Sequence, residues 1–188
     1  SDDNRHRLCK NEPNLFHSLS RTQTIMTGNA PTIALTELVD HLDTYLEAAR
    51  FKDYCPTGLQ VEGRPHVTRL LTGVTACQAL LDYAVAHNFD AVLVHHGYFW
   101  RNESPRITGL RRRRLGTLIH NNISLLAYHL PLDAHPECGN NAQMAKFLKL
   151  ENVQPFGFSR GVYVGVTGEF PAPQSAQQIS RSEERRVG

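Results

Sequence analysis

Apolar positions in the middle of the chain follow two different periods. The first period is helical and predicts an amphipathic helix over Leu35–Arg50. The apolar residues on one face of this helix are Leu35, Leu38, Val39, Leu42, Tyr45, Leu46 and Ala49. In contrast, Ala91–His95 is a continuous apolar run that ends in a histidine. Such a run predicts a strand buried on both faces. Ile123–Tyr128 is a second run of this kind and also leads into a histidine.

Further elements fill the stretch between the first helix and the first buried strand. Leu59–Gly63 is expected to be a short strand or an extended loop, and Val67–Thr75 is rich enough in Val, Leu and Thr to predict a strand. Thr75 and Gln78 have the spacing of a capping box, so a helix is expected to start there and run to about His87. The resulting strand, helix and strand predict a βαβ unit.

The second half continues the alternation. A helix is expected over Arg111–Asn122, and Asn140 or Asn141 can cap a later helix. Gly161–Phe170 predicts a further strand, followed by the start of a helix at Pro173–Ser180. Strands that alternate with helices predict an α/β domain with a largely parallel or mixed sheet.

Composition narrows the class of protein. Hydrophobic residues make up 40% and charged residues 20%, and the net charge of +2 is too small to favour a nucleic-acid partner. The four cysteines form no C-x-x-C pair, which favours a reducing, cytoplasmic location. The chain shows no secretory signal pattern and no apolar run of about 20 residues, so no membrane span is expected.

The two ends differ in pattern from the middle. Residues 1–25 are polar and unpatterned, and Met26 follows them, so they are interpreted as a non-native or disordered leader. Residues 180–188 are charged and have no apolar face, which indicates either an artefactual translated tail or an ordinary surface tail. Between them, residues 26–160 are expected to form the main α/β unit, and residues 161–179 the start of a second.

Histidine is abundant, with ten in the chain, and several follow the two buried strands. Because the carboxyl ends of parallel strands meet at one edge of a sheet, the side chains after both strands are expected to converge. The residues expected to lie together at this edge of the sheet are His95, His96, His129, Asp133 and His135. Imidazole and carboxylate together suit zinc, iron, manganese, cobalt or nickel. Adjacent histidines on a regular strand point to opposite faces, so one site needs the bend that Gly97 permits.

Several residues near these strands have a structural interpretation as well as a functional one. His135 precedes Pro136 in a loop and is equally explained as a solvated side chain. Arg111–Arg114 is either a solvated helix face or a patch for an anionic substrate. Tyr98–Trp100 is better explained as a packed wall or a subunit contact than as a stacking platform, and Cys77 as a core residue.

The motifs, taken together, resemble a known family. They occur in the order Pro56-Thr57-Gly58-Leu59-Gln60-Val61-Glu62-Gly63, Thr72-Gly73-Val74-Thr75, Val94-His95-His96-Gly97-Tyr98-Phe99-Trp100, Tyr128-His129-Leu130-Pro131-Leu132-Asp133-Ala134-His135 and Gly139-Asn140-Asn141. From about Thr36 to about Gly168 the chain resembles the YbgI branch of the Nif-three-like family, the dinuclear-metal proteins also called type 2 homologues of GTP cyclohydrolase I. Its turn is Pro-Thr-Gly where the family pattern is Pro-Asn-Gly.

The resemblance implies a fold of intertwined α/β repeats, the second incomplete here, and a homohexameric ring. It assigns His95, His96 and Asp133 as metal ligands and His129 as a further, catalytic site residue. The complete family site holds two divalent ions per subunit and uses a His-x-x-x-Glu motif near the C-terminus, which this sequence lacks.

The resemblance also implies a function, a metal-dependent hydrolase with a small-molecule substrate such as a nucleotide. Metal-activated water would attack an electrophilic carbon or phosphorus. Without the His-x-x-x-Glu motif, this chain is expected to be inactive or impaired. The alternative is a non-catalytic metal-binding or metal-delivery ring protein.

Overall fold

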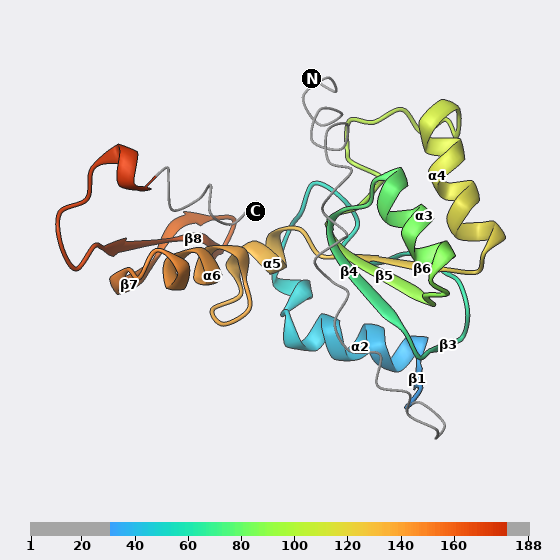
Figure 1. The fold of residues 1–188 in the computed structure, drawn as a ribbon, viewed down its shortest axis with the longest axis horizontal. Coiled ribbons are helices and arrows are strands. Elements are labelled where there is room, and N and C mark those ends of the chain that lie inside the picture. The colour runs from blue at the N-terminus through green and yellow to red at the C-terminus, as the bar shows by residue number, and fades with distance from the viewer. Residues whose placement is uncertain (1–30, 180–188) are drawn as a thin grey trace.

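A four-stranded mixed sheet forms the centre of the larger of two lobes in the computed structural model, which describes residues 31–179 (Figure 1). The strands, in spatial order, are β2 (Gly58–Val61), β6 (Ser124–Ala127), β5 (Ala91–His96) and β4 (Leu70–Thr75). Strands β4, β5 and β6 run parallel, and β2 runs antiparallel to β6 at one edge. The predicted α/β class with a mixed sheet is therefore confirmed.

Helices cover both faces of this sheet, which explains why its central strands are apolar throughout. On one face lie α3 (Gln78–Ala86) and α4 (Gly109–His120), and on the other lies α2 (Leu35–Tyr45) (Figure 1). Val92 and Leu125 pack with the first pair of helices, whereas Ala91 and Leu126 pack with α2. All four side chains are fully buried.

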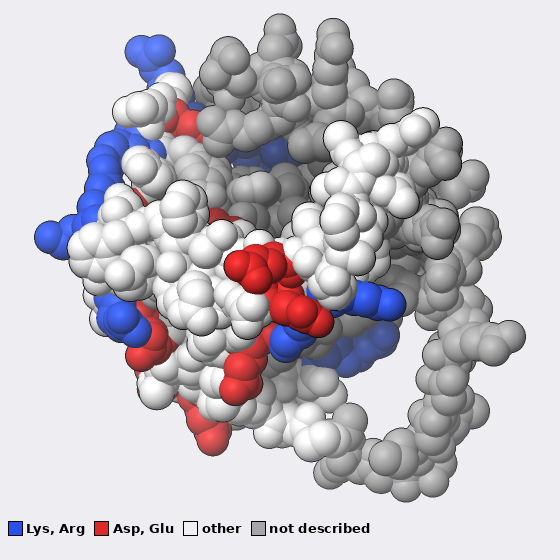
Figure 2. All heavy atoms as spheres, turned by 90° about the vertical axis from the view of Figure 1, so that its left-hand side faces the viewer, with Lys and Arg blue, Asp and Glu red and all other residues white. Residues whose placement is uncertain are grey.

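The smaller lobe is an antiparallel hairpin with one helix. Its elements are α6 (Asn140–Phe147), β7 (Glu151–Ser159) and β8 (Val162–Glu169). The short helix α5 (Leu130–Ala134) follows β6 and joins the two lobes (Figure 1). Seen from the hairpin end, basic side chains lie along the left edge and again near the centre beside acidic ones, and much of the coloured surface is uncharged (Figure 2).

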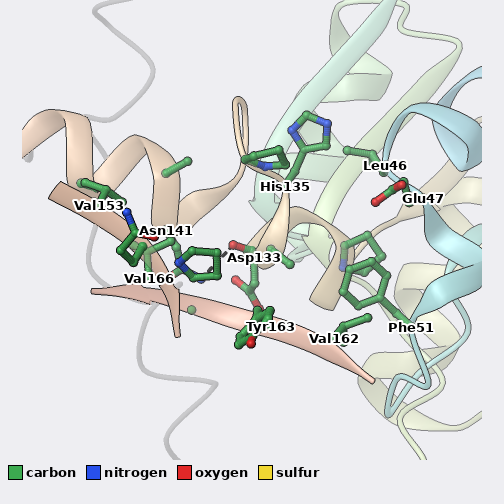
Figure 3. A pocket seen from close by; sticks show the side chains of 18 of the residues that line it. Leu46, Glu47, Phe51, Asp133, His135, Asn141, Val153, Val162, Tyr163 and Val166 are labelled. Atoms are coloured by element: carbon green, nitrogen blue, oxygen red, sulfur yellow. Dashed lines mark hydrogen bonds between the residues drawn. The ribbon is translucent and has the colours of Figure 1, made fainter. Parts of the chain in front are cut away.

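A cavity of about 500 Å³ lies where the two lobes meet (Figure 3). The end of α2, the helices α5 and α6 and the hairpin enclose it, and its walls are mainly apolar. Asp133 and His135 contribute polar groups to its lining, whereas Phe51 and Val162 contribute apolar ones. The cavity therefore shares Asp133 with the edge of the sheet where the histidines were expected.

Two predicted elements have different boundaries. The helix expected over Leu35–Arg50 ends at Tyr45, because Glu47 adopts a left-handed conformation with φ of 50°, and a short 3-10 turn (Ala48–Arg50) follows. The predicted strand Val67–Thr75 is two strands, β4 and the short β3 (His66–Val67), which pairs with β1 (Ile33–Ala34). Between β3 and β4, the backbone N–H groups of Thr68 and Arg69 donate to Asp90.

The predicted helix caps are wrong. Thr75 is the last residue of β4, and Cys77 occupies the N-cap of α3 without a side-chain hydrogen bond. Gly139, not Asn140 or Asn141, is the N-cap of α6. The short side chains that suggested caps make tertiary hydrogen bonds instead, Thr75 to His96 for example.

The C-terminal part agrees only partly with expectation. The predicted strand Gly161–Phe170 is confirmed as β8, but its partner β7 was not expected. The boundary proposed at residue 160 stays a prediction and falls in the turn of this hairpin. The interpretations of residues 1–25 and 180–188 lie outside the described residues. None of the helices within residues 31–179 has both the length and the apolar character that a membrane crossing needs.

Candidate metal centre

Three imidazole rings converge at the carboxyl edge of the sheet. The register pairs Val94 with Ala127, so His95 and His96 at the end of β5 lie beside His129 just after β6. The ring centroids are 4.3 Å apart for His95 and His96, 4.8 Å for His95 and His129, and 5.6 Å for His96 and His129. One ring nitrogen from each lies within 4.8 Å of the others, a spacing that can hold one ion.

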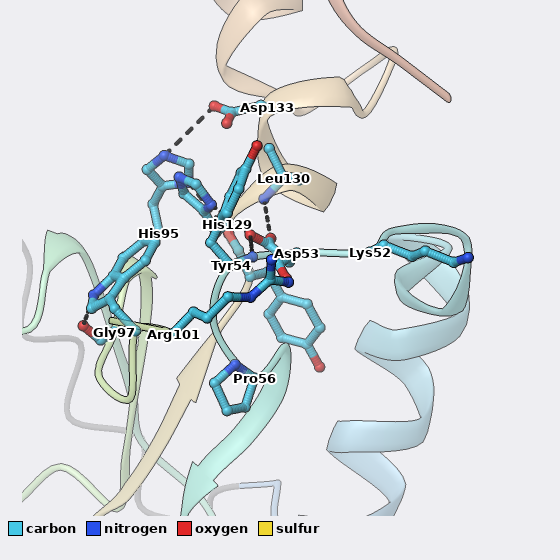
Figure 4. Close-up of polar contacts among 12 residues, drawn as sticks. Lys52, Asp53, Tyr54, Pro56, His95, Gly97, Arg101, His129, Leu130 and Asp133 are labelled. Carbon is cyan, nitrogen blue, oxygen red and sulfur yellow. Dashed lines mark hydrogen bonds and ion pairs between the residues drawn. The ribbon is translucent and has the colours of Figure 1, made fainter. Parts of the chain in front are cut away.

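Asp133 brings a carboxylate to the same place. It lies on α5, and its Oδ1 is 3.5 Å from Nε2 of His95 (Figure 4). The side chain of Asn140 donates to the same carboxylate oxygen at 3.1 Å. The carboxylate of Asp133 therefore lies beside the ring of His95, whose ring nitrogen clusters with those of His96 and His129.

The rings of the His pair are held on the side away from Asp133. Nδ1 of His95 donates to the backbone carbonyl of Tyr128 at 3.3 Å, which leaves Nε2 facing Asp133. Nδ1 of His96 lies 3.2 Å from the hydroxyl of Thr75. Hydrogen bonds of this kind at one ring nitrogen orient the other toward a metal. The donor set thus fits a divalent ion in both chemistry and orientation.

Asp53 holds the third ring and was not predicted as a site residue. Its side chain is 2% exposed, and its Oδ1 accepts from Nδ1 of His129 at 2.9 Å, while its Oδ2 accepts from the backbone N–H of Leu130 at 2.8 Å (Figure 4). Burial alone would raise the pKa of Asp53, but the hydrogen bonds from His129, Leu130 and Tyr54 outweigh it and lower the pKa. Asp53 therefore stays ionised and fixes the proton of His129 on Nδ1.

A second group of potential ligands shares His129, namely Asp53, Cys55 and His129. Burial, followed by the nearby carboxylates of Asp53 and Glu103, raises the pKa of the Cys55 thiol to about 12. The thiolate is the form that binds metal, so this buried thiol is a poor donor at neutral pH. The imidazole cluster is the better metal site of the two.

Neighbouring residues take structural roles. Trp100 packs edge-on against His129 with centroids 4.9 Å apart and donates to the carbonyl of Gly97, as expected for a packed wall. A Cβ on Gly97 would lie 2.5 Å from the Cβ of Ala127, so the close packing after the two histidines leaves room only for glycine. His135 is not in the cluster, because its Nδ1 accepts from Glu137 and Cys138 and its ring lies on Tyr45.

Comparison with known proteins places these features in a family. The family described as Duf34/NIF3 (NGG1p interacting factor 3) matches residues 33–188. A protein of Pseudomonas aeruginosa named GTP cyclohydrolase 1 type 2 homolog is 52% identical over 156 residues, which are 83% of this chain and 62% of that protein. A protein of Haemophilus influenzae with the same name is 46% identical over 149 residues, 79% of this chain and 59% of its own length.

Solved structures agree with this relationship. A protein described as ybgI, of unknown function, superposes with a TM-score of 0.73 at 45% identity and covers 83% of this chain and 61% of its own. A Thermus thermophilus protein superposes with a TM-score of 0.70 at 39% identity, over 81% of this chain and 61% of its own. The chain thus spans about three fifths of the relatives that it matches.

Proposed function

The chain belongs to the Duf34/NIF3 family, and from this premise we propose that the complete protein is a metal-dependent hydrolase with its centre at the carboxyl edge of the sheet. The observation that carries the proposal is the cluster of His95, His96 and His129, with Asp133 beside His95 and with both rings of the His95–His96 pair in contact with hydrogen-bonding groups at Nδ1. Curated relatives bear the name GTP cyclohydrolase 1 type 2 homolog, which favours hydrolysis and a nucleotide substrate.

The residues divide into ligands and a proton acceptor. In the proposed assignment, two rings of the imidazole cluster, His95 and His96, would hold the ion together with the carboxylate of Asp133 beside them, and the third ring, His129, would stay uncoordinated. A divalent metal bound there would supply Lewis-acid activation of water. Asp53 keeps the proton of His129 on Nδ1, so Nε2 carries the lone pair and can accept a proton from the attacking water. The buried carboxylate also stabilises the imidazolium that results. His129 therefore has the position and the tautomer of a general base.

The remaining parts of the family site are proposals for the complete protein. A second divalent ion would need ligands beyond these four residues, and the His-x-x-x-Glu motif of the family is the proposed source. Assembly into a homohexameric ring is proposed on the same ground.

Metal analysis of the purified chain tests the centre. After dialysis against Zn²⁺ or Co²⁺ and removal of excess, the variants His95→Ala and Asp133→Ala should each lose the bound metal that the parent chain retains. His120→Ala is the matched control, because among residues 31–179 this exposed imidazole on α4 forms its hydrogen bond within its own helix, to the carbonyl of Gly116. Metal retained at the parental level in either ligand variant would remove that residue from the centre.

Activity is tested in a complete relative, such as the Pseudomonas aeruginosa protein, loaded to full metal occupancy. The assay offers GTP, other nucleotides, phosphodiesters and peptides. Hydrolysis of one class, lost in the counterpart of the His95→Ala variant, is the expected result. Full occupancy without turnover across this panel would contradict the hydrolase and favour a metal-binding or metal-delivery protein.

A further inference from the structure

Cationic side chains from both lobes meet around Tyr54, the residue that follows Asp53. Arg101 lies in the loop after β5, and Arg160 lies in the turn between β7 and β8. Their guanidinium carbons are 5.7 Å and 5.1 Å from the centroid of the Tyr54 ring, which is the range of cation–π contacts. The exposed side chain of Lys52, on the same segment, extends away from Arg101 and Tyr54 (Figure 4).

Backbone hydrogen bonds hold both guanidinium groups in place. Arg101 donates to the carbonyl of Asp53 at 3.3 Å, and Arg160 donates to the carbonyl of Lys52 at 3.1 Å. A guanidinium has five N–H donors, so these single bonds leave most of them for a ligand. Both forked donors lie near one aromatic ring, and each guanidinium can pair in a bidentate manner with the oxygens of a phosphate group.

The positive charge at this place is not neutralised within the described part of the chain. Arg50, Arg64 and Arg111 each lie within ion-pair distance of a carboxylate. Arg101 and Arg160 have no such partner among residues 31–179. Two exposed guanidinium groups that form no ion pair among the described residues can attract an anion from solution.

The position of this group links it to the metal centre. The carbonyl of Asp53 accepts from Arg101, while its carboxylate holds His129. Trp100, which precedes Arg101, packs on the same imidazole. On the other side Phe51, the neighbour of Lys52, lines the cavity between the lobes. Arg101 and the proposed general base His129 thus share Asp53 as a hydrogen-bond partner.

We propose that Arg101 and Arg160, stacked near Tyr54, form an anion subsite for the phosphate or polyphosphate group of a small-molecule substrate. The inference rests on the proposed function in one respect, because it names the class of substrate that the metal centre acts on. The competing explanation is mechanical, with the two arginines only bracing the hairpin against the sheet lobe. The two explanations differ in whether phosphate binding depends on these side chains.

The test is a calorimetric titration of the full chain with pyrophosphate, in an EDTA-treated and a Zn²⁺-loaded form. Replacement of one charged hydrogen-bonding group should weaken pyrophosphate about 10-fold in Arg101→Gln and in Arg160→Gln, and about 100-fold in the double variant. Arg106→Gln, at an exposed arginine of the loop before α4, is the matched control and should stay within about twofold of the parent. The loss should occur in both the EDTA-treated and the Zn²⁺-loaded form.

The variants Arg101→Lys and Arg160→Lys retain charge without the fork. They should stay folded by circular dichroism and weaken pyrophosphate less than the Gln variants do. Parental affinity in the double Gln variant would overturn the subsite, as would a lower unfolding temperature without a change in affinity. Binding that needs Zn²⁺ and ignores the arginines would overturn the subsite but leave the metal centre intact. Absence of Zn²⁺ binding, with pyrophosphate binding still sensitive to the arginines, would instead contradict the proposed function.

Discussion

The sheet lobe and the hairpin lobe both contain strands rich in β-branched and aromatic residues, but only the sheet buries them. Fully buried side chains of its central strands include Val92, Val94, Leu125 and Leu126. The hairpin exposes Val153, Phe156, Phe158 and Tyr163, at 39%, 63%, 66% and 52%. The difference follows from coverage, because helices pack on both faces of the sheet, whereas among the described residues only α5 and α6 contact the hairpin closely.

The two lobes therefore contribute differently to the site: the sheet lobe positions the histidines, and the hairpin lobe contributes to the cavity. The pairing of β5 with β6 above a buried core places His95, His96 and His129 side by side. The hairpin, whose carbonyl of Val164 accepts from Asn141 at 2.7 Å, contributes Arg160 and one wall of the cavity. The metal centre is thus expected to be insensitive to changes in the hairpin, and substrate contacts to be sensitive to them.

The largest expected contrast comes from truncating one apolar side chain in each lobe. Leu126→Ala empties a fully buried position and should lower the free energy of unfolding by about 2–5 kcal/mol. Phe158→Ala removes a side chain that is 66% exposed and contacts Tyr163, so it should cost less than about 1 kcal/mol. Urea denaturation followed by circular dichroism measures both. Equal losses would mean that the hairpin has a buried core of its own.

A methyl group added to a glycine in each lobe sharpens the comparison at the site. In Gly97→Ala the new Cβ would meet Ala127 at 2.5 Å as well as Gln60, so the variant should lose about 1–3 kcal/mol of stability and weaken metal binding by displacing His96. Gly165→Ala in β8 meets only ordinary contacts, the nearest at 3.5 Å, and should change neither. Unfolding and metal analysis on both variants provide the readout. Unchanged metal content in Gly97→Ala would show that the bend does not position the histidines.

A third contrast compares how a carboxylate in each lobe makes the free energy of unfolding depend on pH. Asp90 accepts hydrogen bonds from Thr68, Arg69 and Arg64, which outweigh the effect of burial and lower its pKa. Since its folded pKa lies below the unfolded value of about 3.9, Asp90 stabilises the fold above about pH 4, and this contribution disappears as pH falls through the folded pKa. Asp90→Asn should therefore lose about 1–3 kcal/mol at pH 7 and show less acid dependence.

The matched hairpin variant is Glu169→Gln, whose carboxylate accepts from Asn152 at the surface. Its free energy of unfolding should stay within about 0.5 kcal/mol of the parent at pH 7, because exposed polar contacts compete with water. Urea unfolding between pH 3 and pH 7 compares the two. A flat pH profile in the parent chain would contradict the role given to Asp90.

The sequence predicted those features that depend on burial and on strand direction. Ala91–His95 and Ile123–Tyr128 were recognisable because a strand buried on both faces is apolar throughout, and parallel strands bring His95 and His129 to one edge. Their proximity to Asp133 agrees with the family resemblance. That these residues bind metal stays a prediction.

The features that were missed depend on contacts between distant positions. Asp53 reaches His129 across 76 residues, and no local period marks such a pair. Thr75 has the spacing of a cap, but its hydroxyl bonds to His96 on the neighbouring strand. Strand β7 carries Pro155 and Gly157, which are disfavoured in strands, and its mostly exposed side chains leave no alternation to detect.

The smallest expected effect comes from two further glycines, where the same substitution by alanine should change the free energy of unfolding in opposite directions. Gly116 lies inside α4, and a Cβ added there would have only His120 within 4 Å, so Gly116→Ala should raise the free energy of unfolding by about 0.5–1 kcal/mol through helix propensity. Gly157 in β7 has φ of 71°, where a Cβ is strained, so Gly157→Ala should lower it by about 1–2 kcal/mol. Urea denaturation of the two variants decides. A loss of stability in both variants would mean that the added methyl group disturbs contacts that hold α4. A gain in both would mean that the backbone of β7 can relax around the new side chain, because the hairpin packs sparsely against the sheet lobe.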